Sequence, residues 1–263
     1  MRKYMSLLKY EAKTIIRDPI NIYMLAFPAI ILALSAFVFP MIFDSIDPMK
    51  GAMLKITMLL LIIIILTFGP FFLAIMATFL LLEHKDEHTL TTIAVTPVGT
   101  SGYLKFKLTY TYLMSVVGII IVLGGTKLLA GDKYSIMGVS FFGSTSPAHI
   151  ISFAFVSGLS TPALALLQGS LAKNKVEGFA MIKGTGILAL VPALMVLETF
   201  QGKLQYLLGL FPNFWAIKGM LVNFMPMADS SDLSFPVYLL IGCVYNLILL
   251  AVAYRLFLKK AEY

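Results

Sequence analysis

The sequence has little of what soluble enzymes use for folding and catalysis: it contains one cysteine, three histidines and few charged residues. Charged residues make up 13% of the chain, whereas about a quarter of a typical soluble domain is charged. The single Cys243 lies within an apolar run, which excludes a disulfide framework and disfavours a metal site built from thiolates. The sequence has no G-x-x-x-x-G-K-S/T phosphate-binding loop, so we do not expect this chain to hydrolyse ATP.

Hydrophobic residues, in contrast, make up 59% of the 263 residues, and the mean hydropathy is +0.92. This composition predicts one domain, residues 1–263, with an all-α polytopic membrane fold. Six apolar runs approach the roughly 20 residues that a membrane-spanning helix needs. The six predicted transmembrane helices are Ile20–Phe43, Ile56–Leu82, Tyr103–Leu129, Ala148–Leu171, Phe179–Leu197 and Pro236–Leu258.

Residues 1–19 are basic and periodic. Lys9, Lys13 and Arg17 fall on one helical face, and apolar side chains fall on the opposite face. This pattern is typical of an amphipathic helix that lies at the membrane interface, with its lysines toward anionic lipid headgroups. Asp18-Pro19 would end the helix. The alternative interpretation is a solvated basic tail.

The basic residues also predict the orientation of the chain. With six spans, fourteen of the twenty Lys and Arg residues fall on the side of the N-terminus and six on the other side. Basic residues collect on the cytoplasmic side of membrane proteins, so both termini are expected in the cytoplasm. The net charge of +7 is explained in this way and does not indicate a nucleic-acid partner.

The polar segment from Glu83 to Lys107, which lies between two apolar runs, is the one sizeable cytoplasmic loop in the predicted topology. His84, Glu87 and His88 match the H-x-x-E-H pattern, in which two histidines hold zinc and the glutamate is a general base. No other histidine falls on the cytoplasmic side, so two solvated histidines are the favoured interpretation and no metal is expected. The loop is interpreted as a docking element for a soluble partner, with an ordinary connecting loop as the alternative.

The segment 199–235 is strongly apolar, but Gly209, Pro212 and Asn213 interrupt it. Neither half is long enough to cross a bilayer. The pattern favours a re-entrant pair of short helices in the outer leaflet, buried against protein, before the last span.

In the order and spacing of these features, the chain resembles the membrane subunits of type-2 ATP-binding-cassette exporters. Members of that family have an amphipathic N-terminal helix, six spans with both ends inside, and two re-entrant helices before the last span. The first cytoplasmic loop of the family carries a Glu, a charged stretch, Gly-Thr-Leu, then Thr-Pro and a basic residue. The matching residues here are Glu83, Thr89-Leu90, Thr96-Pro97, Lys105 and Lys107, and Gly209–Trp215 is similar to the re-entrant turn of the family. His88 departs from the pattern, because the family has Gly there.

The resemblance implies a bacterial cell-membrane permease without enzyme activity or a bound cofactor. It would pair with a second permease copy, or a related chain, and with a separate nucleotide-binding subunit that uses ATP and Mg²⁺. It implies a coupling site at the docking loop and a re-entrant turn. The coupling residues would be Glu83, Glu87, Thr89, Leu90, Thr96 and Pro97, and the turn residues Gly209, Pro212, Asn213 and Trp215.

Apolar, aromatic-rich spans suit a hydrophobic drug, a lipid or an amphipathic peptide as the exported substrate. Two other classes of function stay open at this point. An ATP-independent secondary carrier or channel is disfavoured because no ionisable residue lies clearly near the membrane midplane. A membrane-embedded zinc enzyme would have to use His84, Glu87 and His88.

Overall fold

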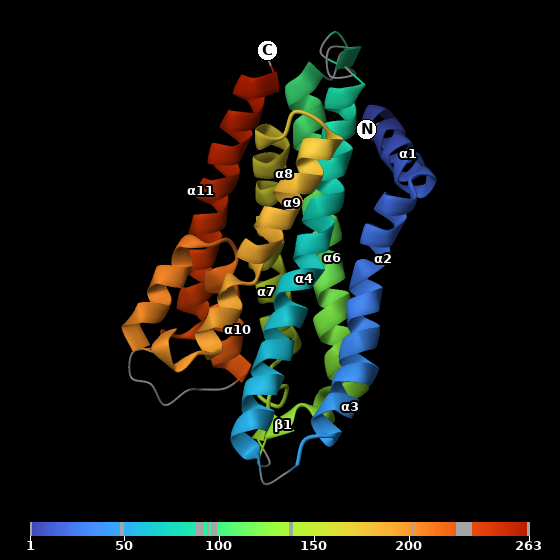
Figure 1. The fold of residues 1–263 in the computed structure, drawn as a ribbon. Coiled ribbons are helices and arrows are strands. Elements are labelled where there is room, and N and C mark those ends of the chain that lie inside the picture. The colour runs from blue at the N-terminus through green and yellow to red at the C-terminus, as the bar shows by residue number, and fades with distance from the viewer. Residues whose placement is uncertain are drawn as a thin grey trace.

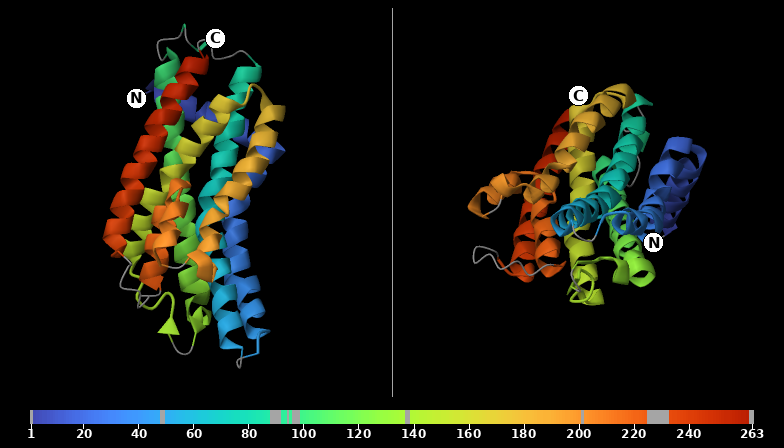
Figure 2. Two further views of the ribbon diagram at one scale, coloured as in Figure 1. Left: turned by 60° about the vertical axis from the view of Figure 1, so that its left-hand side comes forward. Right: turned by 60° about the horizontal axis from the view of Figure 1, so that its bottom comes forward.

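The computed structural model of the chain describes residues 2–47, 50–87, 92–93, 95, 99–136, 139–200, 202–224 and 233–261. In chain order the α-helices are α1 Arg2–Arg17, α2 Pro19–Ala33, α3 Phe39–Asp44, α4 Gly51–Asp86, α6 Gly99–Ala130, α7 Pro147–Gly158, α8 Ser160–Leu171, α9 Lys175–Ala189, α10 Phe214–Phe224 and α11 Phe235–Ala261. Long helices form a bundle, and α1 lies across one end of it (Figures 1 and 2). That end also holds the C-terminal end of α11, and the short strand β1 lies at the opposite end (Figure 1).

Six segments of the bundle are long and apolar enough to cross a membrane, which confirms the predicted all-α polytopic fold with six spans. Each segment contains most of one predicted apolar run. The candidate spans in the structure are Pro19–Asp44, Gly51–Asp86, Gly99–Lys133, Pro147–Leu171, Lys175–Val196 and Phe235–Lys260.

The first span begins at a capped helix terminus. The Asp18 side chain accepts a hydrogen bond from the backbone N–H of Ile20 at 2.9 Å, and Pro19 occupies the first helical position. Both features stabilise a helix start, because they use backbone groups that have no partner inside the helix. The predicted end of α1 and the start of α2 therefore meet at Asp18.

A five-residue π-helix, Leu34–Val38, interrupts this first span between α2 and α3. Its buried Ser35 bonds with the hydroxyl of Thr126 on α6 at 2.5 Å. The phenol of Tyr134 donates to the Ser35 carbonyl at 2.6 Å. A π-bulge alters the regular pairing of helical backbone groups. Here the Tyr134 phenol bonds one backbone group, the Ser35 carbonyl, and Thr126 bonds the Ser35 side chain.

Helix α4 occupies the centre of the bundle and contacts α2, α6, α8 and α9. In its most apolar stretch 72% of the residues are buried, against 6% in the fifth span. A helix that is apolar on all sides is expected to be surrounded by other helices or by lipid. For α4 the surrounding groups are other helices, so the bundle is built around the second span.

The fourth and fifth spans are not single regular helices. α7 and α8 meet at Leu159, close to Pro162, whose ring excludes the carbonyl four residues earlier from a regular helical bond. After α9 the fifth span continues as the 3₁₀-helix Val191–Val196, which contains Pro192. The fourth span is thus divided into two α-helices near Pro162, and the fifth span changes from an α-helix to a 3₁₀-helix next to Pro192.

The connection between α6 and α7 contains regular elements. A short 3₁₀-helix, Gly131–Lys133, leads into a small antiparallel sheet in which β1 Ser135–Ile136 pairs with β2 Val139–Ser140. This hairpin is a local exception to the all-α fold. It packs on the end of the bundle through Tyr134, Phe141 and Phe142, which are buried in the main hydrophobic core.

The segment before the last span folds back along the bundle in two arms. The first arm consists of the 3₁₀-helices Glu198–Phe200 and Gly202–Leu210, and the second arm is α10. Both arms lie beside the half of α11 that is lower in Figure 1. The sequence predicts a helical pair here, and the structure shows that its first member is 3₁₀ in type. Its position relative to a bilayer stays a prediction.

Candidate functional site

The predicted coupling loop begins as a direct extension of α4. Glu83 lies in the last turn of this helix, and Glu87 follows it in a turn. Thr92 and Ile93 are helical, and Val95 is exposed. Four further predicted coupling residues lie outside the part of the chain that the structure describes: Thr89, Leu90, Thr96 and Pro97.

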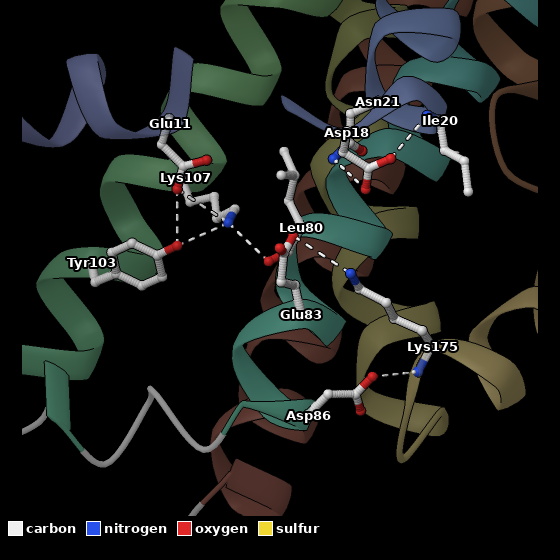
Figure 3. A network of polar contacts seen from close by, with 10 residues as sticks. All are labelled: Glu11, Asp18, Ile20, Asn21, Leu80, Glu83, Asp86, Tyr103, Lys107 and Lys175. Atoms are coloured by element: carbon white, nitrogen blue, oxygen red, sulfur yellow. Dashed lines mark hydrogen bonds and ion pairs between the residues drawn. The ribbon is translucent and has the colours of Figure 1, made fainter. Parts of the chain in front are cut away.

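The end of α4 is attached to the short connection between the fourth and fifth spans. The ammonium of Lys175 lies 3.7 Å from the Glu83 carboxylate, and the backbone N–H of Lys175 donates to the Asp86 carboxylate at 3.1 Å (Figure 3). Asn174 caps the start of α9 by accepting from the backbone N–H of Glu177. Glu83 and Asp86 therefore hold the beginning of the fifth span against the end of α4.

Lys85 strengthens the same attachment from the other side of α4. Its ammonium donates to the carbonyls of Gly169 and Ala172, at the C-terminal end of α8, and lies 5.1 Å from the centre of the Phe257 ring on α11. Carbonyls at a helix C-terminus carry partial negative charge and have no helical partner, so a cation there is favourable. One lysine thus connects α4, α8 and α11 at this end of the bundle.

A buried ion pair fixes α1 to the bundle. The Glu11 carboxylate lies 3.1 Å from the Lys107 ammonium on α6, and each side chain is only 1% exposed. Tyr103 donates to Glu11 at 2.9 Å, and Lys107 donates to the Leu80 carbonyl of α4 at 3.0 Å and to Tyr103 at 2.8 Å (Figure 3). Sequence analysis counted Lys107 in the loop motif but missed Glu11. The signal for Glu11 is a carboxylate one helical turn before the apolar Ile15, on the face that packs against the bundle.

His84 belongs to the same buried region. It is 5% exposed, and its ring meets the edge of the Tyr103 ring at 5.2 Å between centroids. His88, its predicted partner in a zinc site, lies outside the described residues. Among the residues that the structure describes, no group of three or more His, Cys, Asp and Glu side chains could hold a metal ion. The described geometry therefore gives His84 a packing role beside Tyr103.

A polar hollow of about 270 Å³ separates the end of α1 from the end of α4. It brings together side chains that sequence analysis assigned to two different regions: Lys13 and Arg17 of the interfacial helix, and Glu83 and Glu87 of the coupling loop. Asp18 and Thr14 complete its lining. Lys9, Lys13 and Arg17 are all exposed. Their proposed contact with lipid stays a prediction.

The predicted re-entrant turn is a tightly built structure. Asn213 has a positive φ of 64°, a conformation that asparagine tolerates better than most residues. The Trp215 indole donates to the Gly209 carbonyl at 2.9 Å, and the ring lies so close to Gly209 that a side chain there would collide with it. The four predicted turn residues therefore lie together, with Pro212 beside Asn213 in the lining of an apolar cavity.

Comparisons with known proteins indicate the family of this chain. Residues 11–254 match the model of a family described as Rv2686c-like, fluoroquinolones export permease protein. Two relatives from Mycobacterium tuberculosis are named fluoroquinolones export permease proteins: MT2760 of strain CDC 1551 / Oshkosh and Rv2686c of strain ATCC 25618 / H37Rv. Each is 29% identical to this chain over 189 residues, which is 70% of this chain and 66% of the relative. The matched region thus spans just under two thirds of the length of these relatives.

Proposed function

This chain belongs to the Rv2686c-like family of fluoroquinolone export permeases, and from that premise we propose that it is the membrane subunit of an ATP-driven exporter. The family assignment confirms the sequence-based prediction of a multi-pass export permease and favours a transporter over an enzyme. We infer that ATP and Mg²⁺ are bound by a separate nucleotide-binding subunit, because the full sequence has no phosphate-binding loop.

The polar hollow between α1 and α4 is the observation that carries the coupling part of this proposal. Acidic side chains from the α4 end and basic side chains from α1 surround it, so a soluble partner can be recognised by charge from both elements. The predicted docking loop follows directly from Glu87. An ATPase bound here would contact the loop and the α1 helix together.

The network around Lys107 supports a mechanical role for this contact. It joins α1, α4 and α6 through Glu11, Tyr103 and the Leu80 carbonyl, while Glu83 and Asp86 join α4 to α9. Pressure from a closing ATPase on the loop would therefore be passed to four helices at once. In our proposal nucleotide binding shifts the permease between two conformations through this contact, as a population shift requires.

The remaining parts of the assembly rest on the same premise. Two copies of this chain, or one copy and a related chain, would enclose the export pathway in a bacterial cell membrane. The end that holds the polar hollow would face the cytoplasm together with both termini, which the distribution of Lys and Arg supports. The relatives are named for fluoroquinolones, so the proposed substrate is a hydrophobic, aromatic drug of that kind.

Co-purification tests the coupling proposal. The tagged permease is isolated in a mild detergent from its native host, and the ATPase recovered with it is quantified. A Lys13→Glu, Arg17→Glu double variant should lose most of the bound ATPase and the ATPase stimulation, because two cations at the hollow become anions. Lys9→Glu is the matched control, because Lys9 is exposed on the same helix but does not line the hollow.

Equal recovery and equal stimulation in the double variant and the control would overturn the coupling site. The competing function, an ATP-independent carrier or channel, makes a different prediction. Proteoliposomes that contain this chain alone would then transport the drug without nucleotide, and adding the ATPase would not change the rate.

A further inference from the structure

An apolar cavity of about 290 Å³ lies between α4, α8, α9 and α11, and the re-entrant turn closes one side of it. Its floor is formed by buried residues of α4 and α8, among them Pro70, Phe71 and Leu164. Its rim is formed by α9, α11 and the re-entrant segment. The lining residues are Thr67, Pro70, Phe71, Ser160, Leu164, Leu167, Thr185, Leu188, Ala189, Leu210, Phe211, Pro212, Asn213, Tyr245 and Leu249.

The rim residues show that the cavity opens at the surface of the bundle, between α9 and α11. Leu188 of α9 is 44% exposed and Leu210 of the re-entrant segment is 75% exposed, whereas Leu164 on the floor is 9% exposed. Tyr245 and Leu249 of α11 are partly exposed at the opposite rim. Helix α8 contacts both α9 and α11 and closes the cavity from behind. The cavity is therefore a crevice with an apolar mouth.

The position of this mouth along the spans determines which medium it meets. Leu188 lies in the second half of the fifth span, and Tyr245 and Leu249 lie near the middle of α11. The central part of a membrane span is surrounded by the hydrocarbon core of the bilayer. In a membrane, the molecules in front of this mouth are therefore the acyl chains of lipids.

The side chains of the lining offer mainly apolar surface to an occupant. None of the lining residues that the structure describes carries a charge. The hydroxyls of Tyr245, Ser160 and Thr185 are hydrogen-bonded within the protein. Thr67 Oγ1 and Asn213 Oδ1 have no partner among the described residues, but both atoms are covered and are not accessible from the cavity.

This lining discriminates between possible occupants. A water molecule in a cavity needs two to four polar partners, and a drug-like ligand is usually oriented by a few well-placed polar groups. An acyl chain needs neither, because lipid tails are as apolar as leucine. An empty crevice would leave the lining atoms without van der Waals partners on one side. The chemistry therefore favours a hydrocarbon chain.

We propose that this cavity binds one acyl chain of a bilayer lipid, which enters between α9 and α11 and packs beside Pro70 of α4. The bound chain would connect the fifth span, in whose most apolar stretch only 6% of the residues are buried, to α8 and α11. The site requires only that these spans lie in a bilayer. It does not depend on the proposed export function.

Photolabelling of the full chain tests the site without any ATPase. The chain is placed in phosphatidylcholine nanodiscs in which a minor fraction of the lipid carries a diazirine in the middle of one acyl chain. After irradiation, mass spectrometry locates the adducts. We expect adducts on the floor residue Leu164, and none above background on Leu166, which belongs to the same helix, is 0% exposed and does not line the cavity.

Two variants separate the cavity from the general lipid-facing surface. Ala189→Phe places a ring in the cavity, so labelling of Leu164 should fall to the level of Leu166. Leu190→Phe is the matched control, because Leu190 is 39% exposed and does not line the cavity, and labelling should stay unchanged. Leu240, which is 66% exposed on α11, should be labelled equally in all three chains.

Thermal unfolding in detergent gives a second readout. A lipid that binds the folded chain stabilises it, so added phosphatidylcholine should raise the melting temperature of the unaltered chain and of Leu190→Phe. The upward shift should be smaller in Ala189→Phe, because the introduced ring already occupies the cavity. An equal shift in all three chains would contradict a bound acyl chain at this place.

Equal labelling of Leu164 and Leu166 in the unaltered chain would overturn the proposal, and so would unchanged labelling of Leu164 in Ala189→Phe. If another protein chain covered the mouth, Leu188 and Leu210 would be protected together with Leu164, which would also overturn it. If Ala189→Phe does not fold, the comparison of Leu164 with Leu166 decides. None of these results changes the ATPase recovery in the co-purification experiment, so the two proposals can fail separately.

Discussion

The Glu11 carboxylate lies 3.1 Å from the Lys107 ammonium, and this contact joins the N-terminal helix to the third span in a place without solvent. A buried ion pair needs further hydrogen bonds to offset the loss of hydration. Here the phenol of Tyr103 and the Leu80 carbonyl provide them. The pair therefore fixes how α1 lies on the bundle, and α1 carries half of the polar hollow.

Removing one partner of this pair should be costly. Glu11→Gln leaves the Lys107 charge buried without a counter-ion, and we expect a loss of about 3–5 kcal/mol of unfolding free energy. Thermal unfolding in detergent measures it. Replacing both residues, with Glu11→Gln and Lys107→Met, should recover part of the loss.

The exposed pair of Lys133 and Asp44 is the control for this experiment. Its atoms are 3.7 Å apart, and the side chains are 60% and 67% exposed. Lys133→Ala should change stability by no more than about 1 kcal/mol. An equally small effect of Glu11→Gln would contradict the importance of the buried pair.

Gly209 should not tolerate a side chain. In Gly209→Ala the new methyl group meets the Trp215 ring, so the turn must shift, with an expected loss of about 1–3 kcal/mol. Gly184→Ala is the control, since a methyl group at this helical position meets open space and should stabilise α9 slightly. Thermal melts and Trp215 fluorescence measure both, and equal melting temperatures with unchanged emission would refute the expected clash.

The proposed orientation can be tested by labelling in intact cells. In a Cys243→Ser background, a cysteine at Lys9 should react with a membrane-impermeant maleimide only after the cells are opened. A cysteine at Lys133, at the opposite end of the bundle, should react in intact cells, because both side chains are exposed. The reverse pattern would place the polar hollow outside the cell and remove the basis for an ATPase contact.

Tyr134 gives a prediction for alkaline pH. Burial raises the pKa of Tyr134 above its ordinary value, because an ionised phenol would lose its hydration. Its contribution to stability is therefore complete below about pH 10, the usual tyrosine pKa, and declines as the pH rises toward the pKa in the folded state. Tyr134→Phe should lower stability by about 0.5–1.5 kcal/mol at neutral pH, through the lost hydrogen bond to Ser35.

The stability gap between Tyr134→Phe and the unaltered chain should narrow above about pH 10. Denaturant midpoints at several pH values measure it. Tyr23→Phe serves as the control, because Tyr23 is 52% exposed. A gap that stays constant with pH would show that the buried phenol does not titrate as expected.

Much of the fold was predictable because membrane spans are long apolar runs, and their number and order follow from hydropathy alone. Asp18-Pro19 marked the join of α1 and α2 in the same local way. The buried role of Glu11 was not predictable, because a carboxylate on an amphipathic helix is normally solvated and its partner lies 96 positions away in the third span. The π-helix at Leu34–Val38 likewise depends on Thr126 and Tyr134, which are remote in sequence.

The candidate functional site also has features that the sequence predicts and others that it does not. Charge patterns identified Lys13 and Glu83 separately, but their meeting around one hollow depends on how α1 crosses the bundle. The turn from Gly209 to Trp215 was recognised by its residues, whereas the cavity behind it depends on packing among four spans. Features formed by neighbouring residues can be predicted from the sequence, whereas contacts between distant segments are found only in the folded chain.

Helix α4 has 36 residues in one unbroken element, about 54 Å at the usual rise per residue. That is nearly twice the roughly 30 Å of a bilayer core, so α4 is long enough to cross the core and extend beyond it. Pro70 lies inside α4 and has no N–H to donate to the carbonyl four residues earlier. The Thr161 hydroxyl donates to the Pro70 carbonyl at 3.2 Å and so connects α4 to α8 at this point. Pro70 also lines the apolar cavity. Because Glu83 and Pro70 belong to the same helix, a bend of α4 at Pro70 in response to a force on Glu83 would change the shape of this cavity.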